Sequence, residues 1–135
     1  MKKALLLLLL FVSVNIYARE DYKIYAGVET CFKKGNNKWS EWVPCETEII
    51  FSLKDNKIIL KPKANDVFMY LITGENEVFN DSKGQDVRFP MIDQNRQKGH
   101  ITLRIDRNYH SQLIIEYENT LIVYHVVNPR PFENN

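Results

Sequence analysis

The sequence predicts an all-β fold, a small antiparallel barrel or sandwich of about seven or eight strands with a C-terminal meander. Three observations point to it. Short stretches of alternating apolar and polar residues recur between residues 22 and 127, with the period of two that is typical of a half-buried strand. Clusters of turn-forming residues separate these stretches, and no amphipathic helix pattern occurs among them. The pattern does not decide between a barrel and a sandwich.

The N-terminal residues follow the order of a secretory signal peptide. Lys2 and Lys3 precede an unbroken apolar run from Ala4 to Val14, and the small residue Ala18 follows it. The run is about half of the roughly 20 apolar residues that a helix needs to cross a bilayer. We therefore expect cleavage near Ala18, no retained membrane span, and a periplasmic or secreted protein.

Removal of the signal peptide, residues 1–18, leaves enough chain for one domain. We expect a single β domain over residues 19–127 and a flexible tail over residues 128–135, which include two prolines. Of the 18 Lys and Arg residues, 16 remain beside 17 Asp and Glu. Such a balanced surface argues against a nucleic-acid-binding protein and against a polybasic membrane-binding patch.

Within the domain, alternation and turn residues predict the strands in order. The run at residues 67–72 is continuously apolar, so we expect a strand that is buried on both faces. Residues 75–99 are the least regular stretch. A turn at residues 107–111 and a tight turn at Glu118-Asn119 join the last three strands into an antiparallel meander. The expected strands cover residues 22–28, 46–53, 57–61, 67–72, 87–91, 101–105, 112–117 and 121–127.

Both cysteines, Cys31 and Cys45, lie in the part of the chain expected to be exported. An even pair in an oxidising compartment predicts a disulfide. The bridge would close a loop of about fifteen residues and contribute about 3 kcal/mol in the chain-entropy account. The alternative is two buried free thiols. A catalytic cysteine is disfavoured because no nucleophile motif surrounds either residue.

The most distinctive local feature is the pair Trp39 and Trp42, which lies inside the Cys31–Cys45 loop. Two indoles in a constrained loop would form a flat stacking surface for a protein partner or a sugar ring. The other interpretation, which we favour, is that at least one indole closes one end of the β-core. Positions three apart in an extended segment face opposite sides, so one inward and one outward indole is the natural arrangement.

The remaining polar residues predict neither a metal site nor a catalytic centre. His100, His110 and His125 have no second histidine or carboxylate at ligand spacing, so we expect them to be solvated or packed. Residues 80–86 are rich in oxygen ligands around Gly84, but their spacing is wrong for a calcium loop. No nucleophile, phosphate-binding or zinc-protease motif occurs. We therefore expect no cofactor and no enzymatic activity.

With these residues described, the chain resembles a loose group of short exported proteins from Bacteroides-type Gram-negative bacteria. The group has no assigned activity, so the resemblance implies a compartment and a small β-fold but no active site. The chain lacks the Gly-x-Trp signature of lipocalin-like barrels, because Asn37 and Lys38 precede Trp39. The resemblance rests on Lys38-Trp39-Ser40-Glu41-Trp42 followed by Cys45, on the Asp81/Gly84 turn, and on the strands Gly99-His100-Ile101-Thr102-Leu103-Arg104-Ile105 and Gln112-Leu113-Ile114-Ile115-Glu116-Tyr117.

These observations favour a non-enzymatic binding domain. The expected partner is an envelope or secreted protein, including a hydrolase that the domain restrains, and Trp39 and Trp42 are the expected contacts. The alternative is a carbohydrate-binding or small-ligand-binding module in which an exposed indole stacks on the ligand.

Overall fold

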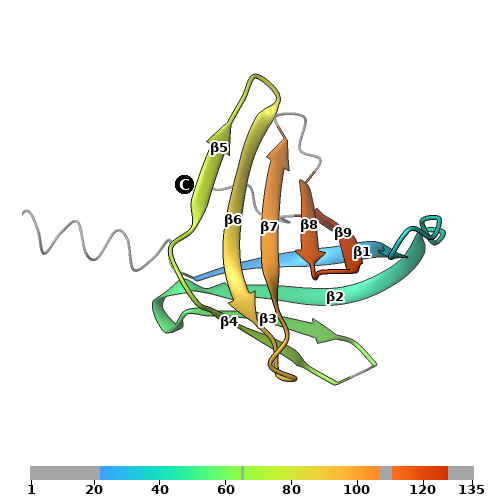
Figure 1. Ribbon diagram of the computed structural model, residues 1–135, viewed down its shortest axis with the longest axis horizontal. Helices are drawn as coiled ribbons and strands as arrows, with labels where there is room; N and C mark the ends of the chain where they lie inside the picture. The colour runs from blue at the N-terminus through green and yellow to red at the C-terminus, as the bar shows by residue number, and fades with distance from the viewer. Residues whose placement is uncertain (1–21, 65, 107–110, 128–135) are drawn as a thin grey trace, which may run out of the picture.

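The computed structural model describes residues 22–64, 66–106 and 111–127 (Figure 1). The expected signal peptide, the expected C-terminal tail, and His110 with most of the turn at residues 107–111 lie outside the described residues. Across the described segments, no helix has the length and apolar character that a bilayer crossing requires.

Antiparallel strands make up most of the described chain, with one turn of 3-10 helix between the second and third strands. Asn56 ends that turn with a positive φ of 55°, as suits an asparagine at a tight connection. The elements are β1 (Tyr22–Lys34), β2 (Val43–Ser52), η1 (Leu53–Asp55), β3 (Lys57–Pro62), β4 (Phe68–Ile72), β5 (Glu77–Asn80), β6 (Gly84–Ile92), β7 (Lys98–Asp106), β8 (Ser111–Glu116) and β9 (Thr120–Val127).

Eight of these strands close into a barrel. The hydrogen-bonded order runs β1-β2-β3-β4-β6-β7-β8-β9, and β9 pairs with β1 again. The predicted all-β class and the C-terminal meander of β7, β8 and β9 are confirmed. Of the two architectures left open by the sequence, barrel and sandwich, the structure is a barrel. Neighbouring strands of the barrel follow one another in the sequence, with β5 set between β4 and β6, so the connectivity is up-and-down. In Figure 1, β5, β6 and β7 run steeply across β1, β2 and β3.

The barrel is closed on one side by a short seam at β6. Along the same edge, β6 pairs first with β5 and then with β4, but β4 contributes only two residue pairs. Pro90 lies between the two sets, because β5 pairing reaches Arg88 and β4 pairing begins at Met91. Proline has no N–H to donate, so it occupies the position at which β6 changes neighbours.

β1 is the longest strand and pairs along both edges, with β2 on one side and β9 on the other. Its register shifts between Gly27 and Glu29 on both edges. Against β9, Val28 is the extra residue of a β-bulge, whereas against β2 the extra residue lies in β2. Tyr25 points into the barrel, whereas Ile24 and Val28 are exposed on the outer face. The bulge turns successive residues of β1 toward that outer face.

The barrel interior is filled by side chains, which is typical of eight-stranded barrels of small diameter. The alternation predicted for the C-terminal strands is present, since Ile101, Leu103, Leu113 and Ile115 all point into the core. The largest side chains with almost no exposed surface are Ile49, Ile58, Leu60, Met91, Ile101, Leu113 and Ile115.

One expectation for the middle of the chain is wrong. β4 is not buried on both faces, because Tyr70 is buried whereas the next residue, Leu71, is 46% exposed on the opposite face; a strand in a barrel wall keeps one face toward solvent. In the stretch of least regular pattern, residues 75–99, the strand expected at 87–91 lies within β6, and the structure adds β5 and the start of β7. A tight turn at residues 81–83 joins β5 to β6 and permits this pairing.

Three tyrosines place polar atoms in or near the core. The Tyr117 hydroxyl donates to Asp93 Oδ2 at 2.9 Å, and it is also hydrogen-bonded to Tyr70. Burial raises the pKa of Tyr70 to about 12. Burial likewise raises the pKa of Tyr25 to about 12, but within the described chain the Tyr25 hydroxyl has no hydrogen-bonding partner.

The unpaired hydroxyl gives a stability prediction. We expect Tyr25→Phe to leave the free energy of unfolding unchanged or to raise it by about 1 kcal/mol, because it removes an unsatisfied buried polar group. Tyr70→Phe, which loses a hydrogen bond, should lower it by about 1 kcal/mol. Urea unfolding at neutral pH measures both. A clear loss of stability in Tyr25→Phe would show that the Tyr25 hydroxyl does have a hydrogen-bonding partner.

The raised pKa of Tyr25 predicts that the protein loses stability at alkaline pH. The folded state favours the protonated phenol, whose ordinary pKa of 10.0 rises to about 12 for Tyr25. The stabilisation from the protonated Tyr25 phenol is therefore complete below pH 10 and is lost as the pH rises from 10 to about 12. Over this range the folding equilibrium constant falls by up to about tenfold per pH unit. Urea midpoints between pH 9 and about 12 should fall less steeply in Tyr25→Phe than in the wild type.

Candidate functional site

A row of polar side chains crosses the outer face of the barrel. It follows from strand register, since Glu29 pairs with His125, His125 with Gln112, Gln112 with Arg104, and Arg104 with Asp86. Paired residues of neighbouring strands point to the same face. The intervening residues of these strands, including Leu103, Leu113 and Tyr124, face the interior. β1, β9, β8, β7 and β6 thus each contribute one side chain to the row.

His125 is held from two sides. Its Nδ1 lies against Glu29 Oε1, an ion pair when the imidazole is protonated. Its ring also stacks on Trp42, with the ring centroids 3.9 Å apart and the planes 17° from parallel. Trp42 immediately precedes β2 and His125 lies on β9, with β1 between them. The indole therefore reaches across β1, and this contact fixes the orientation of both rings.

Cys31 lies on the strand that this bridge crosses. It is on the outer face of β1, two residues beyond Glu29, and pairs with Val123. Although it faces outward, its side chain is only 5% exposed, as expected if the indole that crosses β1 to reach His125 covers it. Burial, followed by the nearby Glu29 carboxylate, raises the pKa of the Cys31 thiol. The thiol is therefore shielded and poorly ionised, unlike a nucleophile.

The predicted Cys31–Cys45 disulfide is wrong, since both residues are free thiols. The reason is the register of β1 and β2. Glu29 pairs with Pro44, so Cys31 and Cys45 are displaced along the ladder in opposite directions. They also have opposite orientations, because Cys45 lies near the inward-facing Tyr124 and its Sγ contacts the Gly27 carbonyl. A disulfide needs Cβ atoms that face one another.

The expectation that at least one indole closes the core is also wrong. Trp39 is 48% exposed and Trp42 is 40% exposed. The Ser40 N–H donates to the Phe32 carbonyl, and the Phe32 N–H donates to Ser40 Oγ, each at 2.8 Å. The segment between β1 and β2 therefore folds back along β1. The Nζ of Lys33 lies 5.9 Å from the centroid of the Trp39 ring, a weak cation–π contact at an exposed site.

The β1–β2 hairpin carries four exposed apolar side chains, which we call the hairpin surface: Phe32, Trp39, Trp42 and Val43, exposed by 55%, 48%, 40% and 56%. Figure 1 shows this hairpin projecting at one end of the barrel. Gly35 permits its turn with a φ of 60°, and the Gly35 N–H donates to the Asn119 carbonyl at 2.6 Å. The turn between β8 and β9 therefore braces the hairpin surface.

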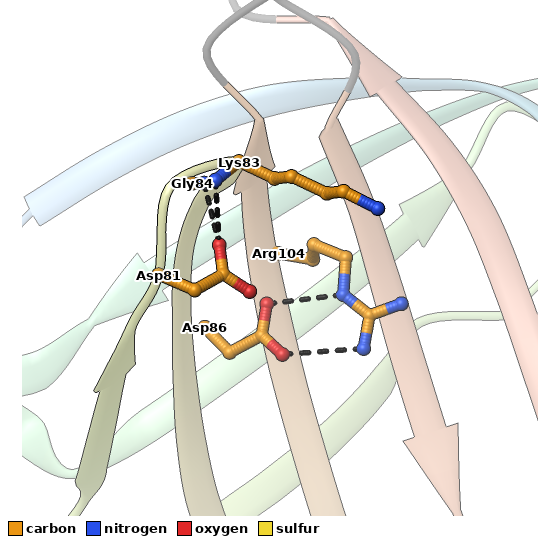
Figure 2. A network of polar contacts seen from close by, with 5 residues as sticks. All are labelled: Asp81, Lys83, Gly84, Asp86 and Arg104. Atoms are coloured by element: carbon orange, nitrogen blue, oxygen red, sulfur yellow. Dashed lines mark hydrogen bonds and ion pairs between the residues drawn. The ribbon is translucent and has the colours of Figure 1, made fainter.

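The other end of the polar row is a compact ion-pair network at the β5–β6 turn (Figure 2). Arg104 binds Asp86 through two contacts, Nε to Oδ1 at 3.0 Å and Nη2 to Oδ2 at 3.2 Å. Asp81 Oδ1 accepts hydrogen bonds from the backbone N–H groups of Lys83 and Gly84, and these bonds lower the pKa of the Asp81 carboxyl. This is the polar turn expected in place of a calcium loop.

Several hollows lie on the surface of the described chain, and three of them contain residues of the polar row or His100. A groove of about 480 Å³ is lined by Glu29, His125, Gln112 and Arg104, among others. It adjoins a hollow of about 260 Å³ around Asp86, which shares Arg104 with it. A separate hollow of about 700 Å³ contains His100 beside Arg88 and Glu116. Among the described residues, no group of three or more His, Cys, Asp or Glu side chains could hold a metal ion.

Sequence reasoning selected Trp42 but missed His125 and Glu29, which hold it in place. These two residues are 96 positions apart, and no local motif marks either of them. Only knowledge that β9 pairs with β1 could have brought them together.

No protein-family profile, curated protein or solved structure matches this chain.

The bridge over Cys31 can be tested through thiol reactivity. In a Cys45→Ser background, Trp42→Ala should raise the rate of Cys31 alkylation about tenfold or more, because it removes the cover from the thiol. Trp39→Ala is the matched control and should leave the rate unchanged. Equal rates in all three proteins, with unfolding excluded by circular dichroism, would show that Trp42 does not shield Cys31.

Proposed function

We propose that this protein is a non-enzymatic binding domain that recognises an envelope or secreted protein through its hairpin surface. The observation that carries the proposal is the concentration of four large apolar side chains, each at least 40% exposed, between residues 32 and 43. Clustered exposed apolar groups of this kind mark interaction sites in soluble proteins, whereas scattered ones do not.

Rigidity of the contact residues supports this role. The stack on His125 holds Trp42 before any partner arrives, and the bonds of Ser40 and Gly35 hold the backbone on either side. A pre-ordered aromatic anchor loses little side-chain entropy on binding. Tryptophan is also among the residues that most often dominate the binding energy of an interface.

Charge around the hairpin surface suggests the chemistry of the partner. Lys33, Lys34 and Lys38 surround the aromatic residues, with Glu41 as the acidic residue of the same segment. A complementary partner has an apolar centre and an acidic rim, which would also steer association. A projecting, rigid segment suits insertion into a cleft, so envelope hydrolases that this domain restrains are the first candidates. The proposed location in the periplasm or outside the cell rests on the signal peptide that the sequence predicts at the N-terminus.

The proposal predicts a tryptophan-dependent protein complex. Immobilised protein, purified after export, should capture a specific protein from envelope or spent-medium extracts of its own bacterium, identified by mass spectrometry. With that partner purified, Trp39→Ala and Trp42→Ala should each weaken binding by about 30-fold, equivalent to about 2 kcal/mol per hot-spot residue.

A matched control is available on the other side of the barrel. Phe79 on β5 is also an exposed aromatic residue, and Phe79→Ala should leave the affinity unchanged. A partner whose affinity is the same for the wild type and both tryptophan variants would overturn the proposal, as would a folded bait that captures no specific protein.

A further inference from the structure

The 480 Å³ groove is built by the strand geometry and is separate from the hairpin surface. Gln112 on β8 lies at its centre, between His125 on β9 and Arg104 on β7. The β1 bulge forms one wall, because the shifted register brings both Val28 and Glu29 to the groove. Bulges of this kind commonly re-aim side chains beside functional sites.

The polar groups of the groove are fixed in orientation before a ligand binds. Arg104 is held by the bidentate contact to Asp86, and His125 is held by Glu29 and Trp42. The Glu29 contact uses Nδ1 and leaves Nε2 as the imidazole nitrogen for a ligand. The side-chain amide of Gln112 supplies both a donor and an acceptor at the centre.

Apolar surface lies beside these polar groups. Val28 and Val127 line the groove, and both are exposed. Alternating polar groups and small apolar patches match a sugar, whose hydroxyl groups both donate and accept hydrogen bonds and whose ring faces present C–H groups. A purely apolar ligand would leave the polar groups of the groove unpaired, at a cost in affinity.

The charge of the lining selects against acidic ligands. Among the described residues of the groove, the Glu29 carboxylate lies with one permanent cation, Arg104. The adjoining hollow adds Asp81 and Asp86 with Lys83, whose side chain extends over the same side as the Arg104 guanidinium in Figure 2. Carboxylates therefore outnumber permanent cations, and a uronate would be repelled. A neutral ligand meets ion pairs that are already neutralised by each other.

The two hollows meet at Arg104 and Asp106. From β9 to β6 they span three strand spacings, about 14 Å at roughly 4.8 Å each. Such an elongated shape suits a chain of several rings better than a single compact molecule. The geometry points to a neutral oligosaccharide as the ligand, bound across β9, β8, β7 and β6. This inference goes beyond the proposed protein-binding function and does not depend on it.

The test uses neutral and acidic oligosaccharides of equal length. Hexamers derived from glucan, xylan, mannan and galactan, with an oligogalacturonate as the acidic counterpart, are titrated into the protein purified after export. Amide chemical-shift changes locate the site. We expect a saturable response to at least one neutral hexamer, centred on residues 111–112, 104 and 125, and a weaker response to the oligogalacturonate.

Variants of a single residue type give the control. Gln112→Ala should weaken binding of that hexamer by about tenfold, whereas Gln94→Ala, the same change in the exposed β6–β7 connection, should leave it unchanged. Trp39→Ala should not alter glycan binding, and Gln112→Ala should not alter capture of a protein partner, so failure of either proposal is distinguishable. The inference is overturned if no neutral hexamer shifts these amides, if only the acidic one does, or if Gln112→Ala binds as tightly as the wild type.

Discussion

The pairing of β9 with β1 is the constraint on which the structure depends. It joins the first and the last strand of the described chain, so that eight of its strands form the barrel and the short β5 lies outside it. The same pairing sets Glu29 opposite His125 although 96 residues separate them. That contact orients the imidazole, and the imidazole supports Trp42, whose indole crosses β1. A change of one residue in this register would turn the whole set into the core.

The bulge in β1 reconciles the packing of the interior with the exposed row outside. At Gly27, a Cβ atom would lie 3.2 Å from Tyr124 and 3.3 Å from Ile49, so the interior is already crowded at this point. The following residue is inserted at the bulge and, with Glu29, faces outward into the groove. The crowded core around Gly27 therefore determines the position of Val28 and Glu29, which form one wall of the groove. The cost of the bulge is a local loss of ladder pairing, which the long pairing of β1 with both neighbours offsets.

Local pattern predicted what depends on local pattern. The alternation around Ile101 and Leu113 identified two strands and their inner faces, and the three-strand meander followed from short connections. The uniformly apolar run at 67–72 misled because exposed apolar residues such as Leu71 are common on barrel exteriors. The strand expected at 87–91 lies within β6, but the change of neighbours at Pro90 could not be predicted because it is a property of the whole sheet. The site could not be predicted for the same reason: the Glu29–His125 contact and the opposite orientations of the two cysteines arise from closure and register.

Trp42 belongs to both candidate surfaces, and this limits how strongly they can influence each other. Its edge contributes to the hairpin surface, while its face supports His125 at the wall of the groove. A ligand that displaced the imidazole would break the ring stack, and such aromatic pairs contribute about 0.5–1.5 kcal/mol beyond their buried area. Energetic coupling between the two surfaces through this contact therefore cannot exceed about tenfold in affinity, and by linkage it acts equally in both directions. The hydrogen bonds of the hairpin backbone to Phe32 and Asn119 do not pass through His125, so most of the hairpin surface is held independently of the groove.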